Sequence, residues 1–166
     1  MDQEIINSYS KLSGLNVPRE TFSDFESYIS MILEKNEKIN LIGNKFNEKN
    51  DIIERHIIDS AQIIDIVDFN NNTTTDIGSG SGMPGIIIAI LLKSLKKDVK
   101  VKLYEKSYHK SHFLRDVSTK LNLKTEIIQK NIFEERKIDT GTIMSRAFKP
   151  MPVVLDLVNE NFINFS

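Results

Sequence analysis

The chain has 166 residues, of which 40% are hydrophobic and 27% charged, and its formal net charge is −1. This size and balance fit one globular domain, or one domain with a small appendage. Cysteine is absent and only three histidines occur, which excludes disulfides and thiolate chemistry and leaves little material for a metal site. The apolar run at 86–92 is far shorter than the roughly 18 residues that span a bilayer, and the acidic start is unlike a signal peptide. We therefore expect a cytoplasmic protein with no metal and no membrane segment.

Two helices are predicted in the first part of the chain. Apolar side chains at helical spacing over 21–39 indicate an amphipathic helix that begins after Pro18, with Thr21 or Ser23 as its cap. A second helix at about 51–67 carries Arg55 and Asp59 four residues apart, a spacing at which the two side chains can pair. Three consecutive asparagines at 70–72 then break the pattern. They predict a boundary between an N-terminal helical extension, 1–70, and a core at 73–166.

From residue 73 onward, strand and helix patterns alternate. Strands are predicted at 73–77, 99–105, 125–129 and 142–145, and helices at 84–96, 109–121 and 152–161. Strands separated by helical stretches of this length form βαβ units with parallel pairing. The predicted fold class is therefore α/β, with a Rossmann-like parallel sheet that follows the helical extension.

A glycine-rich loop joins the first of these strands to the helix that follows it. Gly78, Gly80, Gly82 and Gly85 are four of the seven glycines in the chain. Glycine tolerates positive φ and lets a ligand approach the backbone closely, and a tight turn alone needs only one or two glycines. The loop therefore predicts a ligand site at the end of the first strand.

The spacing of this loop fits two kinds of nucleotide site. The segment from Gly80 to Gly85 matches the dinucleotide fingerprint G-x-G-x-x-G, with the acidic Glu105 further on. NAD is disfavoured because Pro84 has no backbone N–H at the place where a pyrophosphate needs donors. A phosphate-free cofactor fits the loop better.

A pattern that begins earlier, D-x-G-x-G-x-G from Asp76 to Gly82, resembles the first motif of the class I S-adenosylmethionine-dependent methyltransferases. The resemblance implies cofactor contacts at Asp76, Gly78 and Gly80. It also implies that Glu105, at the end of the second strand, accepts hydrogen bonds from the ribose hydroxyls of the cofactor.

Further motifs follow one another along the chain. They are Asn40-Leu41, Arg55-His56-Ile57-Ile58-Asp59-Ser60, Gly82-Met83-Pro84-Gly85, Phe113-Leu114-Arg115 and Ser145-Arg146-Ala147-Phe148. Their combination resembles the bacterial small-subunit ribosomal RNA methyltransferase G family, also called glucose-inhibited division protein B. The resemblance implies methyl transfer from S-adenosylmethionine to ring nitrogen 7 of a guanine in 16S rRNA, with the rRNA or the small ribosomal subunit as partner.

The family resemblance also implies which residues contact the cofactor. They are Gly78, Met83, Ile132, Phe133 and Arg146. Arg146 is in addition the candidate for positioning the cofactor or the target base. Nitrogen 7 of guanine has a free lone pair, so this reaction needs no general base, and the sequence shows no certain catalytic residue.

Positive charge is concentrated in one block of the chain. Residues 93–124 carry ten Lys or Arg against three Asp or Glu, whereas residues 1–92 carry seven against fourteen. Such a block is typical of a polyanion-binding surface, although lysines of this kind also simply solvate a surface. Within the block, Lys110 and Arg115 are the candidates for contacts to RNA phosphates.

The C-terminal part shows fewer strands than a class I methyltransferase sheet. Four strands are visible, with the start of a further one at 162–165. We expect the C-terminal strands to be missing or truncated and the strand at 142–145 to lie at an open edge of the sheet. Three other interpretations stay open, namely a small-molecule methyltransferase, an NAD-binding oxidoreductase and an inactive truncated remnant.

Overall fold

The computed structural model describes residues 9–10, 12, 17–43 and 49–165. Its first helices are α2 (Arg19–Asn36), α3 (Lys49–Ile52), the π-helix η3 (Ile53–Ile58), α4 (Asp59–Ala61) and the 3-10 helix η4 (Gln62–Ile66). The elements that follow are β1 (Thr73–Ile77), α5 (Gly85–Ser94), β2 (Lys100–Tyr104), α6 (Tyr108–Lys120), β3 (Thr125–Ile128), the 3-10 helix η5 (Ile132–Glu134), β4 (Ile138–Asp139), β5 (Thr142–Ser145), α7 (Met151–Asn161) and β6 (Phe162–Ile163).

Four of the strands form one parallel sheet in the order β3-β2-β1-β5. In its register, Thr74 of β1 lies between Val101 of β2 and Thr142 of β5. The α/β class and the four predicted strands are confirmed, and β5 lies at an edge of this sheet as expected. Because all four strands are parallel, their carboxyl ends meet at one edge.

The segment expected to begin a further strand pairs elsewhere. β6 lies parallel to β4, with Phe162 opposite Ile138, and the two form a separate two-stranded sheet. The segment at 162–165 thus does begin a strand, of two residues, but this strand does not extend the main sheet. β4 was not predicted at all, because two residues are too few for an alternating pattern to show.

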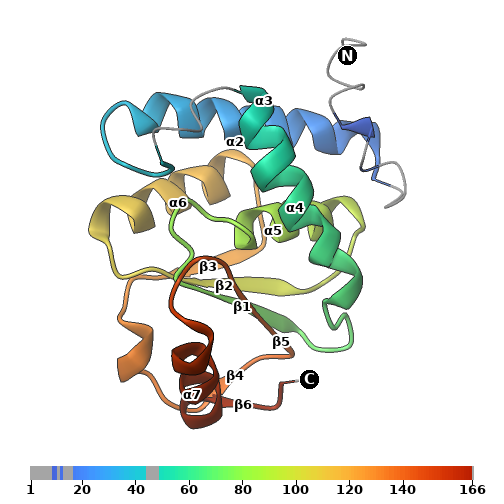
Figure 1. Cartoon of the computed structure of the whole chain (residues 1–166). Coiled ribbons are helices and arrows are strands. Elements are labelled where there is room, and N and C mark those ends of the chain that lie inside the picture. The colour runs from blue at the N-terminus through green and yellow to red at the C-terminus, as the bar shows by residue number, and fades with distance from the viewer. Residues whose placement is uncertain (1–8, 11, 13–16, 44–48, 166) are drawn as a thin grey trace.

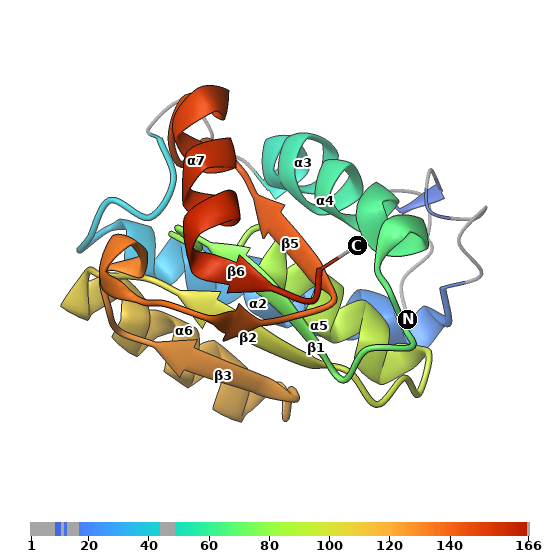
Figure 2. The ribbon, with the colours of Figure 1, turned by 90° about the horizontal axis from the view of Figure 1, so that it is seen from below.

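The helices lie on the two faces of the sheet in unequal numbers (Figures 1 and 2). One face is covered by α5 and α6, with α2 and the helical segment α3–η4 packed outside α5. The other face carries α7 with the β4–β6 pair. Among the described residues, no helix is both long enough and apolar enough to cross a membrane.

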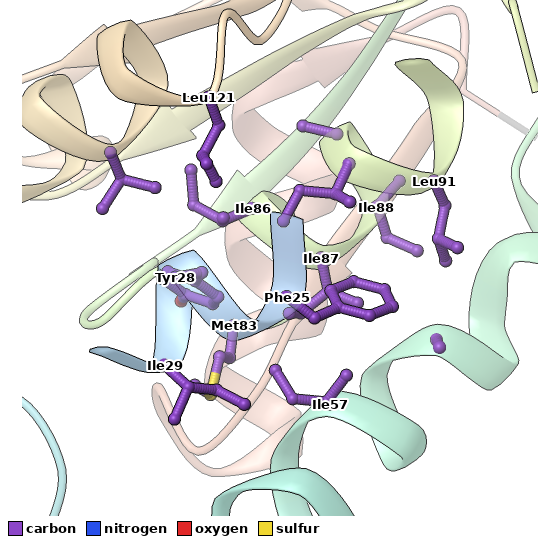
Figure 3. Close-up of a cluster of buried hydrophobic side chains, with 14 of the residues drawn as sticks. Phe25, Tyr28, Ile29, Ile57, Met83, Ile86, Ile87, Ile88, Leu91 and Leu121 are labelled. Atoms are coloured by element: carbon purple, nitrogen blue, oxygen red, sulfur yellow. The ribbon is translucent and has the colours of Figure 1, made fainter. Parts of the chain in front are cut away.

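The main hydrophobic core lies between α2, η3 and α5 (Figure 3). Every residue of α5 from Gly85 to Leu92 is buried, because this helix is enclosed by the sheet on one side and by the N-terminal helices on the other. Phe25 of α2 and Ile57 of η3 are both 0% exposed and belong to the same cluster as Ile87. The N-terminal helices and the sheet thus share one core.

The N-terminal helices differ from the predicted ones in detail. α2 begins after Pro18 without a side-chain cap, and Thr21 instead donates a hydrogen bond from Oγ1 to Ser94 Oγ of α5, at 2.7 Å. The caps expected at Thr21 or Ser23 were therefore wrong. The second helix is a succession of α, π, α and 3-10 turns rather than one regular α-helix.

Candidate functional site

A cavity of about 620 Å³ opens at the carboxyl edge of the sheet. Its walls come from the glycine loop after β1, the segments that follow β2, β3 and β5, and the turn at 41–43. Ligands of open α/β sheets bind at this edge, and the volume is within the usual range for small-molecule sites. The cavity is therefore the candidate binding site.

The glycine loop is fixed on both sides by buried hydrogen bonds. The N–H groups of Gly78 and Ser79 both donate to Tyr104 O of β2, at 3.0 Å each. Tyr28 of α2 donates from its buried hydroxyl to Ser81 O at 2.7 Å. The loop is thus held in one conformation by the neighbouring strand and by an N-terminal helix.

Asp76 lies behind this loop and does not line the cavity. Its side chain is fully buried, and Oδ2 accepts a hydrogen bond from Gly85 N at 3.0 Å. Oδ1 is buried and has no hydrogen-bond partner among the residues that the structure describes. Burial raises the pKa of Asp76 to about 7, although the bond from Gly85 opposes the shift. Asp76 therefore supports the loop from behind and is not among the cavity-lining residues, where the motif implied a cofactor contact.

The N-terminus of α5 has its first N–H groups engaged within the protein. Pro84 has none, Gly85 N–H donates to Asp76, and Ile86 N–H donates to Gly82 O at 2.6 Å. A helix N-terminus binds phosphate through free N–H groups. The first two N–H groups of α5 are thus not free to bind a pyrophosphate.

Glu105 lies at the end of β2, where the sequence predicted it, and lines the cavity. The residue is 9% exposed. Oε2 accepts a hydrogen bond from Gly80 N at 2.9 Å, and Oε1 accepts one from Ser107 N at 2.8 Å. The two backbone donors fix the orientation of the carboxylate. Lone pairs remain on each oxygen for further donors.

The apolar wall beside Glu105 is formed by Ile132 and Phe133 of η5, which follows β3. Ile132 is 3% exposed, and its carbonyl accepts a hydrogen bond from Asn161 Nδ2 of α7. Phe133 is 36% exposed, and Met83 of the glycine loop, 6% exposed, also lines the cavity. These side chains offer a flat apolar surface to a ring system.

Arg146 follows β5 and connects this edge to the N-terminal helices. Nη2 donates to Arg55 O at 2.7 Å and lies 3.4 Å from Asp59 Oδ2, while Nη1 lies 3.5 Å from Ser60 Oγ. Asp59 thus forms an ion pair with Arg146, whereas Arg55 Nε lies 3.8 Å from Asp51 Oδ1. Arg146 lines the cavity and also holds η3 in place.

His56 of η3 also lines the cavity. Burial lowers its pKa, and the positive charge of Arg146 lowers it further, against the opposing effect of Asp59. The lowered pKa favours the neutral form of the imidazole. The π-helical geometry of η3 coincides with this wall, a place where such helices often occur.

The turn at 41–43 is a part of the cavity wall to which the sequence analysis assigned no role. Asn36, the last residue of α2, accepts hydrogen bonds at Oδ1 from Leu41 N and Ile42 N, at 2.9 and 3.0 Å. Both apolar residues line the cavity. The Asn40-Leu41 motif was the only sequence signal for this turn.

Positive charge surrounds the cavity. Lys106, Lys110, Lys130, Arg146 and Lys149 all line it. Arg115 lies exposed on α6 outside the cavity wall, so the structure separates it from Lys110.

Other lysines of the basic block make contacts away from the cavity. Lys93 pairs with Asp24 at 3.0 Å, and Lys124 pairs with Asp98. Only part of the block therefore faces the candidate site.

Comparison with solved structures defines the class of fold. A structure described as a protein-L-isoaspartate O-methyltransferase of Plasmodium falciparum, in complex with S-adenosyl-L-homocysteine, superposes with a TM-score of 0.50 at 15% identity, covering 91% of this chain and 78% of that one. Coclaurine N-methyltransferase, bound to N-methylheliamine and S-adenosyl-L-homocysteine, gives 0.51 at 13% identity, covering 95% of this chain and 54% of that one. The fold is that of the class I S-adenosylmethionine-dependent methyltransferases.

Sequence comparison then gives the family. Residues 21–163 match the family described as rRNA small subunit methyltransferase G. A protein of Pelagibacter ubique with the name "Ribosomal RNA small subunit methyltransferase G" is 59% identical, with 98% of this chain and 76% of the relative covered. A protein of the same name from Allorhizobium ampelinum is 34% identical, with 88% and 68% covered. The chain belongs to the rRNA small subunit methyltransferase G family.

The cavity brings together most of the residues singled out from the sequence. Those that line it are Gly78, Gly80, Met83, Glu105, Lys110, Ile132, Phe133 and Arg146. Asp76 and Arg115 do not line it. Four further residues line the cavity although the sequence analysis assigned them no role, namely Leu41, Ile42, Phe148 and Lys149. Of these, only Leu41 and Phe148 lay within quoted motifs.

Proposed function

We propose that this chain transfers a methyl group from S-adenosylmethionine to ring nitrogen 7 of a guanine in 16S rRNA, acting in the cytoplasm on the rRNA or the small ribosomal subunit. The observation that carries the proposal is the single cavity in which an oriented carboxylate, an apolar wall and several cations meet. The names of the relatives supply methyl transfer and small-subunit rRNA, and the family resemblance of the sequence motifs supplies ring nitrogen 7 of guanine.

The cavity residues fit S-adenosylmethionine better than NAD. Glu105 presents lone pairs suited to a ribose diol, and Ile132 and Phe133 present an apolar surface suited to adenine. A cofactor without phosphate needs no free N–H at the start of α5, where Gly85 and Ile86 already donate within the protein.

In this reaction the main task of the protein is to position the reacting atoms. When bound, S-adenosylmethionine supplies a methyl group whose carbon–sulfur bond breaks as a bond to nitrogen 7 forms, and the electron pair of the broken bond stays on sulfur. Nitrogen 7 gives up no proton, so no side chain of this chain has to act as a base. Aligning the reacting atoms contributes about 7–11 kcal/mol in favourable cases. The fixed glycine loop and the Arg146 contacts are suited to that task.

The cofactor assignment is tested by calorimetry with S-adenosylmethionine and with NAD. We expect the wild-type chain to bind the first and not the second. Glu105→Gln should weaken S-adenosylmethionine binding by about 1–3 kcal/mol, the contribution of hydrogen bonds to a charged group. Glu126→Gln, at an exposed position of β3, is the matched control and should bind normally. Unchanged affinity in Glu105→Gln would remove Glu105 from the site.

The acceptor is tested by mapping methyl groups. The chain, S-adenosylmethionine and either naked 16S rRNA or small subunits lacking the modification are incubated together. Borohydride reduction and aniline cleavage at 7-methylguanosine then locate the modified nucleotide. Cleavage at one guanine is the expected result. Methylation of small molecules without RNA modification would favour the small-molecule interpretation instead.

A further inference from the structure

The cavity has two ends, set by the order of the strands. The segment after β3 contributes Phe133 and the end of β2 contributes Glu105, while the glycine loop follows the central β1. Beyond β1 lies β5, followed by Phe148 and Lys149. Under the proposed function, on which this inference rests, a cofactor that extends from β3 to β1 leaves the β5 end of the cavity to the methyl acceptor.

The aromatic ring of Phe148 lines the cavity at this end and is closely fitted to the glycine loop. A Cβ built on Gly78 would lie 2.1 Å from Cδ2 of Phe148, so the ring rests directly on the glycine backbone. Ala147, just before it, has a φ of +50°, a left-handed conformation that reverses the chain toward the loop. Such strain in a non-glycine residue is often retained at a functional site.

The ring of Phe148 also pairs with the ring of Phe133, which comes from the segment after β3. Its centroid lies 6.0 Å from that of Phe133, at an interplanar angle of 26°. Phe148 is partly buried and packs against the small cluster that contains Ile132 and Leu157. The orientation of the Phe148 ring is therefore fixed by packing, as a stacking surface requires.

Cations are next to this ring. Arg146 and Lys149 are close in sequence, and both line the cavity. Arg146 is held by Arg55 O and Asp59, whereas Lys149 is exposed to solvent. An aromatic surface with adjacent cations is the combination that binds single-stranded nucleic acid, through stacking and phosphate contacts.

We propose that Phe148 is the surface on which the acceptor guanine stacks, with Lys149 contacting a flanking phosphate. Enzymes that modify a base act on single-stranded nucleotides or extrude the base from its stack, and a protein aromatic ring then replaces part of the stacking with neighbouring bases. Phe133 then serves the cofactor on the β3 side, and the neighbouring ring of Phe148 serves the acceptor on the β5 side of the same cavity.

A direct binding test uses the absence of tryptophan from this chain. Phe148→Trp introduces a single indole, which we expect guanosine 5′-monophosphate to quench in the presence of S-adenosylhomocysteine. Ribose 5-phosphate, which has the phosphate but no base, should not quench it. Phe69→Trp, at a position outside the cavity wall, is the control for non-specific quenching.

A kinetic test separates stacking from simple packing. We expect Phe148→Leu to stay folded, as judged by circular dichroism, and to lose about 10- to 100-fold in kcat/KM for RNA when S-adenosylmethionine is saturating. Phe148→Tyr, which retains the ring, should restore most of that loss.

Three results would overturn the inference. They are a Phe148→Leu variant within twofold of wild type for RNA, full quenching of Phe148→Trp by S-adenosylhomocysteine alone, and no quenching by guanosine 5′-monophosphate. If the wild-type chain fails to methylate 16S rRNA, the proposed function fails, and the nucleotide quenching still decides the role of Phe148.

Discussion

The two faces of the sheet are packed very differently. On the α5 face, the large cluster encloses α5 and includes Phe25 and Ile57, each 0% exposed. On the α7 face, a small cluster centres on Leu157 and Phe162, while Met151 and Leu155 are 67% and 54% exposed. Stability is therefore concentrated on one face, because only there are helices covered on both sides.

The candidate site lies where these two kinds of packing meet. The glycine loop is anchored on the well-packed side, through Tyr28 of α2 and the buried Asp76. Ile132 and Phe148, which both line the cavity, pack with the small cluster. A rigid loop opposite a more lightly packed wall suits a site in which one ligand is held and another enters and leaves.

The largest difference is expected for buried phenylalanines on the two faces. Phe25→Ala should lower the free energy of unfolding by about 3–5 kcal/mol, because the surrounding helices cannot close the resulting space. Phe162→Ala, 5% exposed in the small cluster, is the matched variant and should cost about half as much. Urea unfolding followed by circular dichroism measures both. Equal costs would show that the two faces contribute alike.

The buried Asp76 makes the anchored side sensitive to pH. The pKa of Asp76 is raised from 3.8 in the unfolded state to about 7 in the folded state. Between these two pH values the folded protein therefore holds a proton that the unfolded chain has released. Its contribution to stability is therefore fully present below about pH 4 and is lost as pH rises toward 7. Across that range we expect a loss of about 2–4 kcal/mol.

Asp76→Asn should remove this part of the pH dependence. Urea denaturation at several pH values between 4 and 8 compares the slopes of the two proteins. Glu126→Asn, at an exposed position on β3, is the control and should keep the wild-type slope. Parallel curves for wild type and Asp76→Asn would show that the carboxyl is ionised throughout.

Gly82 and Gly80 of the loop should also differ in how much stability is lost when each is replaced by alanine. Gly82→Ala places a Cβ 2.5 Å from Ile86 Cγ1 and 2.8 Å from Leu114 Cδ2, at a φ of +101°. We expect a loss of about 2–3 kcal/mol in stability. Gly80→Ala meets only Gly78 O at 3.8 Å and should cost about 1 kcal/mol, from its φ of +57° alone. Thermal unfolding ranks the two, and the reverse order would contradict this account of the loop.

The smallest effects are expected for two cations of α6. Lys110 lines the cavity and Arg115 does not, although both were predicted to contact RNA. Lys110→Ala should reduce the slope of log affinity for RNA against log salt by about 0.7–0.9, the value of one phosphate contact. Arg115→Ala should change it less. If Arg115→Ala gives the larger change, RNA crosses α6 outside the cavity.

Local patterns in the sequence were enough to predict most of the fold. β1 and β5 have the predicted bounds, and α5, α6 and α7 lie within two residues of theirs at each end. Alternation, helical spacing and glycine chemistry act over a few residues, so a single sequence shows them. For the same reason the glycine loop and Glu105 were placed correctly at the carboxyl edge.

Other features were decided only by the tertiary structure. Arg146 binds Arg55 O, which is 91 residues away, and Asn36 holds a turn that shapes the cavity. Asp76 was expected at the cavity wall, but the structure places it in a buried position behind the loop. Contacts between distant segments and the burial of a charged group depend on how helices and strands pack, and this packing leaves no periodic signal in the chain. The sequence by itself therefore determined the sheet and its loop, whereas packing decided which side chains face the cavity.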